Sequence, residues 1–125
     1  MHNLKELKIS SKAINLATRV YKATENFPSE EKYALTSQIR RSAVSIASNI
    51  SEGAGRNSDK EFVYFLGVAN GSAYELQTQL VISAQLNLIS EDIVDQILSE
   101  LTEIQKMNFT FQKTLKNRRS EAVNI

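Results

Sequence analysis

The sequence predicts an all-α protein, an up-down-up-down antiparallel four-helix bundle that forms one domain over residues 1–125. Apolar residues recur at helical spacing in four long stretches, and no stretch alternates as a strand does. The chain has 1 proline and 4 glycines, so few residues interrupt these stretches. The segments between them are short, and long helices joined by short loops lie antiparallel to their neighbours in the chain.

The first predicted helix spans about residues 4–25. Its apolar residues form two adjacent stripes, which together predict a wide buried face. The first stripe is Leu7, Ile14, Ala17 and Tyr21, and the second is Ile9, Ala13, Leu16 and Val20. The helix is predicted to end before Phe27-Pro28, because the residue before a proline avoids helical backbone angles.

The second predicted helix spans about residues 30–52, with Ser29 as its N-cap and two glutamates in its first turn. Small residues on this helix allow another helix to approach closely, and Gly53 and Gly55 supply its end. Its apolar stripe is Leu35, Ile39, Ala43, Ile46, Ala47 and Ile50.

The third predicted helix spans about residues 59–86 and the fourth about residues 91–118. Ser58 and Glu61 form a capping box for the third, and Ser90 caps the fourth. Residues 120–125 are expected to fray. The apolar stripes are Phe62, Leu66, Ala69, Ala73, Leu76 and Leu80 in the third helix, and Ile97, Leu101, Ile104, Phe111 and Leu115 in the fourth. Asn108 interrupts the last stripe.

The composition excludes most catalytic and metal chemistry. The chain has no cysteine and one histidine, His2, so disulfides, thiol catalysis and Cys-ligated metal sites are excluded. A bundle di-metal site needs Glu-x-x-His pairs, and none is present. Gly53-Ala54-Gly55 follows a predicted helix rather than a strand, so it is interpreted as a turn and not as a dinucleotide site. We therefore expect no catalytic residue, no metal and no cofactor.

Targeting signals are also missing from the sequence. The residues after Met1 lack the apolar core of a signal peptide, and no apolar run approaches the length of about 20 residues that a membrane helix needs. We therefore expect a cytoplasmic protein with no membrane partner.

The predicted topology separates charges that nearly balance in total, where 15 Lys and Arg face 14 Asp and Glu. Nine cations and five anions gather at one end, for a net charge of +4, and the opposite end carries −3. The nine cations are Lys5, Lys8, Lys12, Arg56, Lys60, Lys113, Lys116, Arg118 and Arg119.

Two explanations of this separation stay open. Acids at the start of a helix and bases at its end interact favourably with the helix dipole, and this explains the distribution of charges along the fourth helix. A basic end that contacts phosphates is the other explanation, and it accounts for lysines 5, 8 and 12 at a helix start.

A second group of residues predicts an ion pair or an interface between subunits. Arg40 and Arg41 lie midway along the second helix, and Glu75 is expected at the same level of the third as a partner for one of them. Tyr64, Gly67, Gly71 and Tyr74 lie off the main stripe of the third helix. A mid-helix glycine costs up to about 1 kcal/mol relative to alanine, and close packing would offset that cost. Packing against another chain is favoured over an intrachain helix crossing.

The central segment carries a family resemblance. Residues from about 27 to 88 resemble the four-helix-bundle family encoded in 23S ribosomal RNA intervening sequences. The resemblance is carried by Phe27-Pro28, Leu35 to Ile46, Ser48 to Arg56, Lys60 to Phe62, Phe65-Leu66, Ala69 to Ser72 and Glu75 to Leu80. The family is similar to the accessory protein of diversity-generating retroelements. That resemblance implies a bacterial cytoplasmic bundle, a homopentamer with a basic surface and work with nucleic acid, and it brings no catalytic residues.

Two functional hypotheses follow. The first is a non-enzymatic homo-oligomer that binds RNA or DNA through its basic end by phosphate-led contacts, with little base reading. Phe109 and Phe111 are expected to pack inside, so they leave the basic end without aromatic side chains. The alternative is a scaffold or accessory subunit that docks a partner protein through the tyrosine face. An enzyme is not expected, because the usual nucleophile, base and metal sets are absent.

Overall fold

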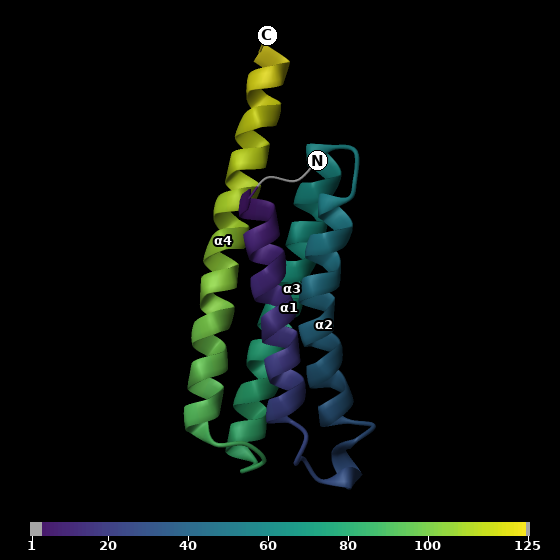
Figure 1. The fold of residues 1–125 in the computed structure, drawn as a ribbon, viewed down its shortest axis with the longest axis vertical. Coiled ribbons are helices and arrows are strands. Elements are labelled where there is room, and N and C mark those ends of the chain that lie inside the picture. Colours follow the sequence, from purple (N-terminus) through teal and green to yellow (C-terminus); the bar gives the residue numbers. More distant parts are fainter. Residues whose placement is uncertain (1–3, 125) are drawn as a thin grey trace.

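The computed structural model describes the backbone of residues 4–124 and the side chains of residues 8–118. Four α-helices follow one another: α1 (Leu4–Ala23), α2 (Leu35–Ala54), α3 (Asp59–Gln85) and α4 (Glu91–Asn124). A short 3-10 helix, η1 (Ser29–Glu31), lies between α1 and α2. The helices run up and down in chain order (Figure 1), and the described backbone contains no strand. The predicted all-α four-helix bundle is confirmed.

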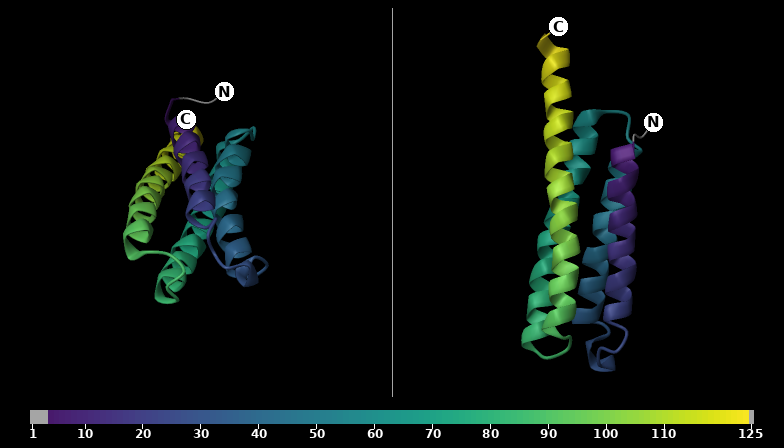
Figure 2. Two further views of the ribbon diagram at one scale, coloured as in Figure 1. Left: turned by 60° about the horizontal axis from the view of Figure 1, so that its bottom comes forward. Right: turned by 60° about the vertical axis from the view of Figure 1, so that its left-hand side comes forward.

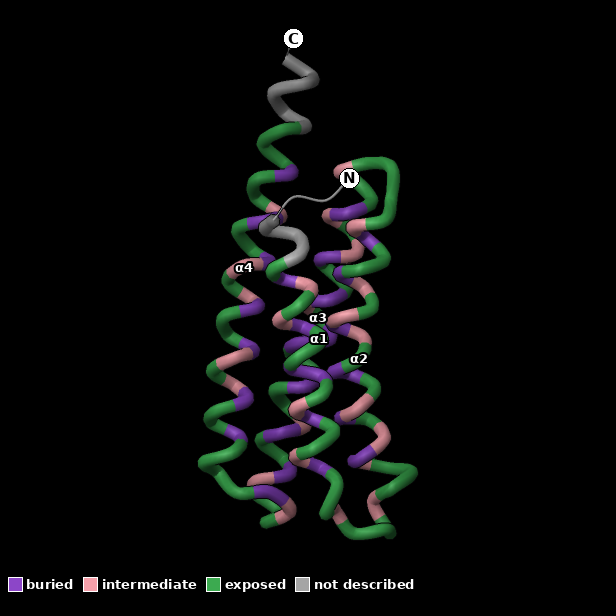
Figure 3. The backbone as a smooth tube through the Cα atoms, viewed as in Figure 1, coloured by how far each residue is buried: buried purple, intermediate pink, exposed green. Residues whose placement is uncertain are grey.

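The core runs along the axis of the bundle. Both α1 and α3 pack against α2 and α4, so α1 and α3 lie diagonally opposite each other (Figure 2). Every helix contributes buried residues (Figure 3). The largest fully buried side chains are Ile9, Leu16, Val20, Ile39, Ile46, Ile50, Leu66, Leu76, Leu80, Ile97, Leu101 and Leu115. Burial of each contributes about 1.5–3 kcal/mol relative to exposure.

The prediction that the second helix begins at residue 30, capped by Ser29, is wrong. Residues 29–31 form η1, and α2 begins at Leu35 after Ala34, whose backbone leaves the helical region. No residue of η1 is buried, and α2 buries its first side chain at Thr36. Helices in proteins are held mainly by packing of an apolar face, so the capping signals alone do not extend α2 backwards.

The prediction of a wide buried face on α1 is partly wrong. The stripe Ile9, Ala13, Leu16 and Val20 is buried, but Ile14 and Tyr21 of the other stripe are 52% and 43% exposed. Leu7 lies outside the described side chains. One stripe of α1 fills the core, and part of the second remains at the surface.

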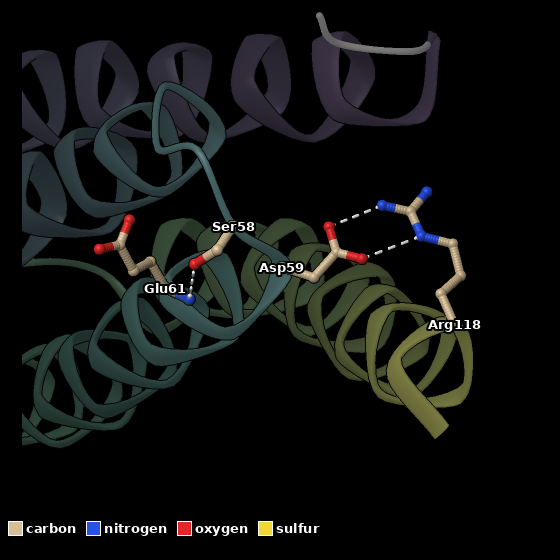
Figure 4. Close-up of polar contacts among 4 residues, drawn as sticks. All are labelled: Ser58, Asp59, Glu61 and Arg118. Atoms are coloured by element: carbon tan, nitrogen blue, oxygen red, sulfur yellow. Dashed lines mark hydrogen bonds and ion pairs between the residues drawn. The ribbon is translucent and has the colours of Figure 1, made fainter. Parts of the chain in front are cut away.

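The caps of α3 and α4 are confirmed. The Ser58 hydroxyl oxygen accepts a 3.2 Å hydrogen bond from the backbone N–H of Glu61 (Figure 4), and Ser90 accepts one from Ile93 at 3.2 Å. Within the described chain, the Glu61 carboxylate makes no hydrogen bond back to Ser58, so only half of the capping box forms. α4 continues to Asn124, beyond its predicted end at residue 118.

Candidate nucleic-acid interface

Three segments meet at one end of the bundle: the start of α1, the turn between α2 and α3, and the last turns of α4. Figure 1 shows that α4 reaches beyond the other helices at this end. Of the nine predicted cations, Lys5 and Arg119 have side chains outside the described residues. The other seven differ in what surrounds them, and these surroundings determine which of them can meet a ligand.

Three of the seven form ion pairs within the chain. These pairs are Lys12 with Glu103 at 2.8 Å, Arg56 with Glu52 at 3.1 Å, and Arg118 with Asp59 at 2.8 Å. Arg118 contacts both carboxylate oxygens of Asp59 (Figure 4), through Nε at 3.1 Å and Nη2 at 2.8 Å. Nearby carboxylates therefore compensate these three charges.

Glu103 is an acidic neighbour of Lys12 that is not among the five anions counted at the basic end. The pKa of Glu103 is lower than its ordinary value of 4.5. The largest cause is the hydrogen bond from Lys12, followed by the positive charge of Lys12, and the charge of Lys8 has a smaller effect. Lys12, which is half-buried, therefore belongs to an ion pair between α1 and α4 with the exposed Glu103.

The remaining cations are exposed. Lys8 contributes to the electrostatic environment of Glu103, whereas the side chains of Lys60, Lys113 and Lys116 make no ion pair with any described residue. Lys113 and Lys116 lie on α4, the helix that extends beyond the others. Two of these three lysines of the basic end thus lie together on α4.

The prediction that Phe109 packs inside is wrong, whereas the same prediction for Phe111 is confirmed. Phe111 is 6% exposed and its ring centroid lies 5.2 Å from that of Phe62. Phe109 is 72% exposed. It lines a groove of about 240 Å³ on the outer side of α4, and the other lining residues are Gln112, Lys113, Lys116 and Asn117. The basic end therefore carries an exposed aromatic ring beside two free lysines.

Lys106 was missed as a candidate. It is exposed and lies one turn before Phe109, so it belongs to the same face of α4. A signal was present in the sequence, because residues 106–119 contain five bases and no acid. The position of Lys106 toward the middle of the helix excluded it from a group defined by the end of the bundle.

Arg40 does not pair with Glu75. Its guanidinium donates to Thr24 Oγ1 at 3.0 Å and to the carbonyl oxygen of Tyr21 at 3.2 Å, and it lies 4.5 Å from the centroid of the Tyr21 ring. Arg40 thus secures the segment where α1 ends. Arg41 and Glu75 are exposed and make no ion pair with a described residue, so their role at an interface stays a prediction.

The predicted face of α3 is exposed. Tyr64 and Tyr74 are 65% and 60% exposed. A Cβ added at Gly67 or Gly71 would meet no other atom within 4 Å. An intrachain helix crossing therefore does not explain these glycines. The face continues along α3 into a groove of about 360 Å³ that includes Tyr74, Val81 and Ile82.

A second apolar groove lies on different helices. It has a volume of about 370 Å³ and is lined by Ile14, Ala17, Thr18, Tyr21, Val44, Ala47 and Ser48 of α1 and α2. Within the described chain, no cluster of three or more His, Cys, Asp or Glu side chains could hold a metal ion. No described helix is long and apolar enough to span a bilayer.

The comparisons with known proteins agree with this architecture. The chain is similar to a crystal structure of a protein of unknown function from the S23 ribosomal protein family of Bacteroides thetaiotaomicron, with 26% sequence identity and a TM-score of 0.81. The match covers 88% of this chain and 99% of the other. No curated protein matches the chain. Residues 5–110 match the profile described as 23S rRNA-intervening sequence protein, and the chain therefore belongs to that family.

Proposed function

We propose that this protein is a non-enzymatic, cytoplasmic homo-oligomer that binds structured RNA or DNA through the basic end of its bundle. The observation that carries the proposal is the pair of exposed lysines, Lys113 and Lys116, which no described acid compensates on the helix that extends beyond the others. Lysines of this kind attract phosphates, and their binding releases the counterions that surround the nucleic acid. Membership of a family named for ribosomal RNA intervening sequences is consistent with such a ligand.

Two apolar faces support the oligomer. The tyrosine face of α3 and the groove between α1 and α2 are different surfaces of one protomer, and both are exposed. Contact between two different surfaces of identical chains is head-to-tail, and such contacts close into a ring when the rotation allows it. A ring would gather several basic ends and raise the local potential for phosphates. The homopentamer implied by the family resemblance is a closed ring of this kind.

Salt dependence tests the binding. Fluorescence anisotropy with a labelled RNA hairpin and a DNA duplex is expected to show affinity that falls steeply with salt. Changing both Lys113→Gln and Lys116→Gln is expected to reduce the slope of log affinity against log salt by about 2. The matched control changes Lys22→Gln and Lys32→Gln, two exposed lysines toward the opposite end, and is expected to leave the slope unchanged.

Absence of binding at low salt would contradict the proposal. If both double variants reduce the salt slope equally, binding depends on the overall charge of the protein and not on its basic end. The scaffold alternative is favoured instead if a protein partner binds with little salt dependence through the tyrosine face of α3.

A further inference from the structure

We propose that the outer face of α4 binds unpaired nucleotides, with Phe109 stacking on a base and Lys106, Lys113 and Lys116 contacting the flanking phosphates. We call these four residues the α4 strip. The inference rests on the proposed function and narrows its ligand to a single-stranded stretch of nucleic acid. The matched family segment ends at residue 110, so Lys113 and Lys116 lie beyond it.

The four side chains share one face of the helix. Lys106, Lys113 and Lys116 stand three residues before, four after and seven after Phe109, and all of these spacings bring residues onto the same side of an α-helix. A rise of about 1.5 Å per residue places Lys106 about 4.5 Å before the ring along the axis and Lys113 about 6 Å after it. A nucleotide stacked on the ring would have a cation on either side for its two phosphates.

The orientation of Phe109 is set by the core. Asn108 and Phe111 are 2% and 6% exposed, so they occupy the inner side of α4 on either side of Phe109 in the sequence. The Asn108 amide is held by the carbonyl oxygen of Leu66 at 2.9 Å. The ring of Phe109 consequently faces solvent and is available to a ligand.

The charges favour nucleic acid over a protein as the occupant of the strip. Its three lysines make no ion pair with any described residue, and residues 104–118 contain no acid. Protein interfaces are depleted in lysine, whereas phosphates complement it. Base–aromatic stacking combined with a positively charged surface is the usual means of holding single strands.

An exposed ring also distinguishes single strands from duplexes. Bases in a duplex are stacked on one another and offer no free face, whereas an unpaired base can stack on an aromatic side chain. The strip is therefore expected to contribute more to binding of a single strand than to binding of a duplex. Stacking and phosphate contacts require no 2′-hydroxyl, so single-stranded RNA and DNA of the same sequence are expected to bind alike.

The chain contains no tryptophan, so Phe109→Trp introduces a single fluorescent reporter. Addition of an unlabelled uridine oligomer is expected to quench this fluorescence. The same oligomer is expected to leave the tryptophan fluorescence of a Tyr33→Trp variant unchanged. Tyr33 is a suitable control because it is 89% exposed and lies in the loop at the opposite end. Phe109→Leu is expected to weaken binding of the oligomer by about 5-fold or more, in the range that loss of one base–aromatic stack produces.

Comparison with the lysine double variant separates the two proposals. Phe109→Leu should leave the salt slope nearly unchanged, whereas changing Lys113 and Lys116 to Gln should reduce it. Wild-type affinity in Phe109→Leu, together with weakened binding in the lysine variant, would overturn the α4 strip and leave the proposed function standing. Absence of binding to any nucleic acid at low salt would overturn both. A loss of duplex affinity as large as the loss of single-strand affinity in Phe109→Leu would also contradict the strip.

Discussion

The side-chain amide of Asn108 donates a 2.9 Å hydrogen bond to the carbonyl oxygen of Leu66 inside the bundle, where Asn108 is only 2% exposed. Gln112 in turn donates to Asn108 Oδ1 at 2.7 Å. This polar contact joins α4 to α3 at a position where the apolar stripe of α4 is interrupted. It fixes how α4 is turned, and thus places Phe109 on the outside.

Loss of the Asn108 side chain is expected to destabilise the bundle. Asn108→Ala removes a buried hydrogen bond, leaves a cavity and should lower the free energy of unfolding by about 2 kcal/mol. Thr110→Ala, an exposed position on the same helix, is expected to change it by less than about 0.5 kcal/mol. Urea unfolding monitored by circular dichroism measures both, and equal midpoints for the two variants would contradict the assigned role.

Gly53 is required by the close approach of α2 to α3. A Cβ at this position would lie 2.8 Å from the Cβ of Phe65 and 2.9 Å from Cδ1 of Phe62. Gly53→Ala is therefore expected to lower the free energy of unfolding by about 1 kcal/mol, because overpacking outweighs the better helix propensity of alanine. Gly55→Ala is the control, since its Cβ would meet atoms only at 3.6 Å. Thermal unfolding should give Gly53→Ala a lower melting temperature than Gly55→Ala, and the reverse order would contradict the steric explanation.

The tyrosine face of α3 is expected to hold the oligomer together. Tyr74→Lys places a charge on this exposed apolar face and should reduce the molar mass measured by light scattering, with the helical circular dichroism retained. Thr102→Lys adds the same charge at an exposed position of α4 and should leave the mass unchanged. A wild-type protein that is monomeric, or a Tyr74→Lys variant with the wild-type mass, would show that this face is not an interface.

The ion pair between Lys12 and Glu103 gives stability a defined pH dependence. The pKa of Glu103 is lower in the folded protein than its ordinary value of 4.5, so the unfolded chain takes up a proton first as the pH falls. The contribution of the pair to the free energy of unfolding is fully present above pH 4.5, and it is lost as the pH falls through the lowered pKa of Glu103. Because Glu103 is exposed to solvent, the effect on the melting temperature is expected to be small.

Glu103→Gln tests this pH dependence. The variant should melt below wild type at neutral pH, and the difference should vanish in acid. Glu25→Gln, which removes an exposed carboxylate that has no ion-pair partner among the described residues, should show no such difference. A gap between wild type and Glu103→Gln that persists below the lowered pKa would exclude the ion pair as its cause.

The sequence determined the features that depend on local interactions. Helical periodicity, few helix-breaking residues and the serine caps at Ser58 and Ser90 predicted α3 and α4 close to their observed starts, because capping and periodicity involve residues only a few positions apart. Short loops then left one arrangement for four long helices. The gathering of basic residues at one end followed from that topology.

The tertiary structure alone decided which side of each helix faces inward and which charges remain free. Ile14 and Tyr21 belong to a predicted apolar stripe, and Phe109 was expected to pack inside. All three are exposed, because a helix buries only the stripe that its two neighbours cover. Ion pairs such as that of Lys12 with Glu103 join residues far apart in the chain, so spacing could not predict which lysines remain free. Phe109 is exposed beside lysines without ion-pair partners among the described residues because Asn108 and Phe111, and not Phe109, pack into the core.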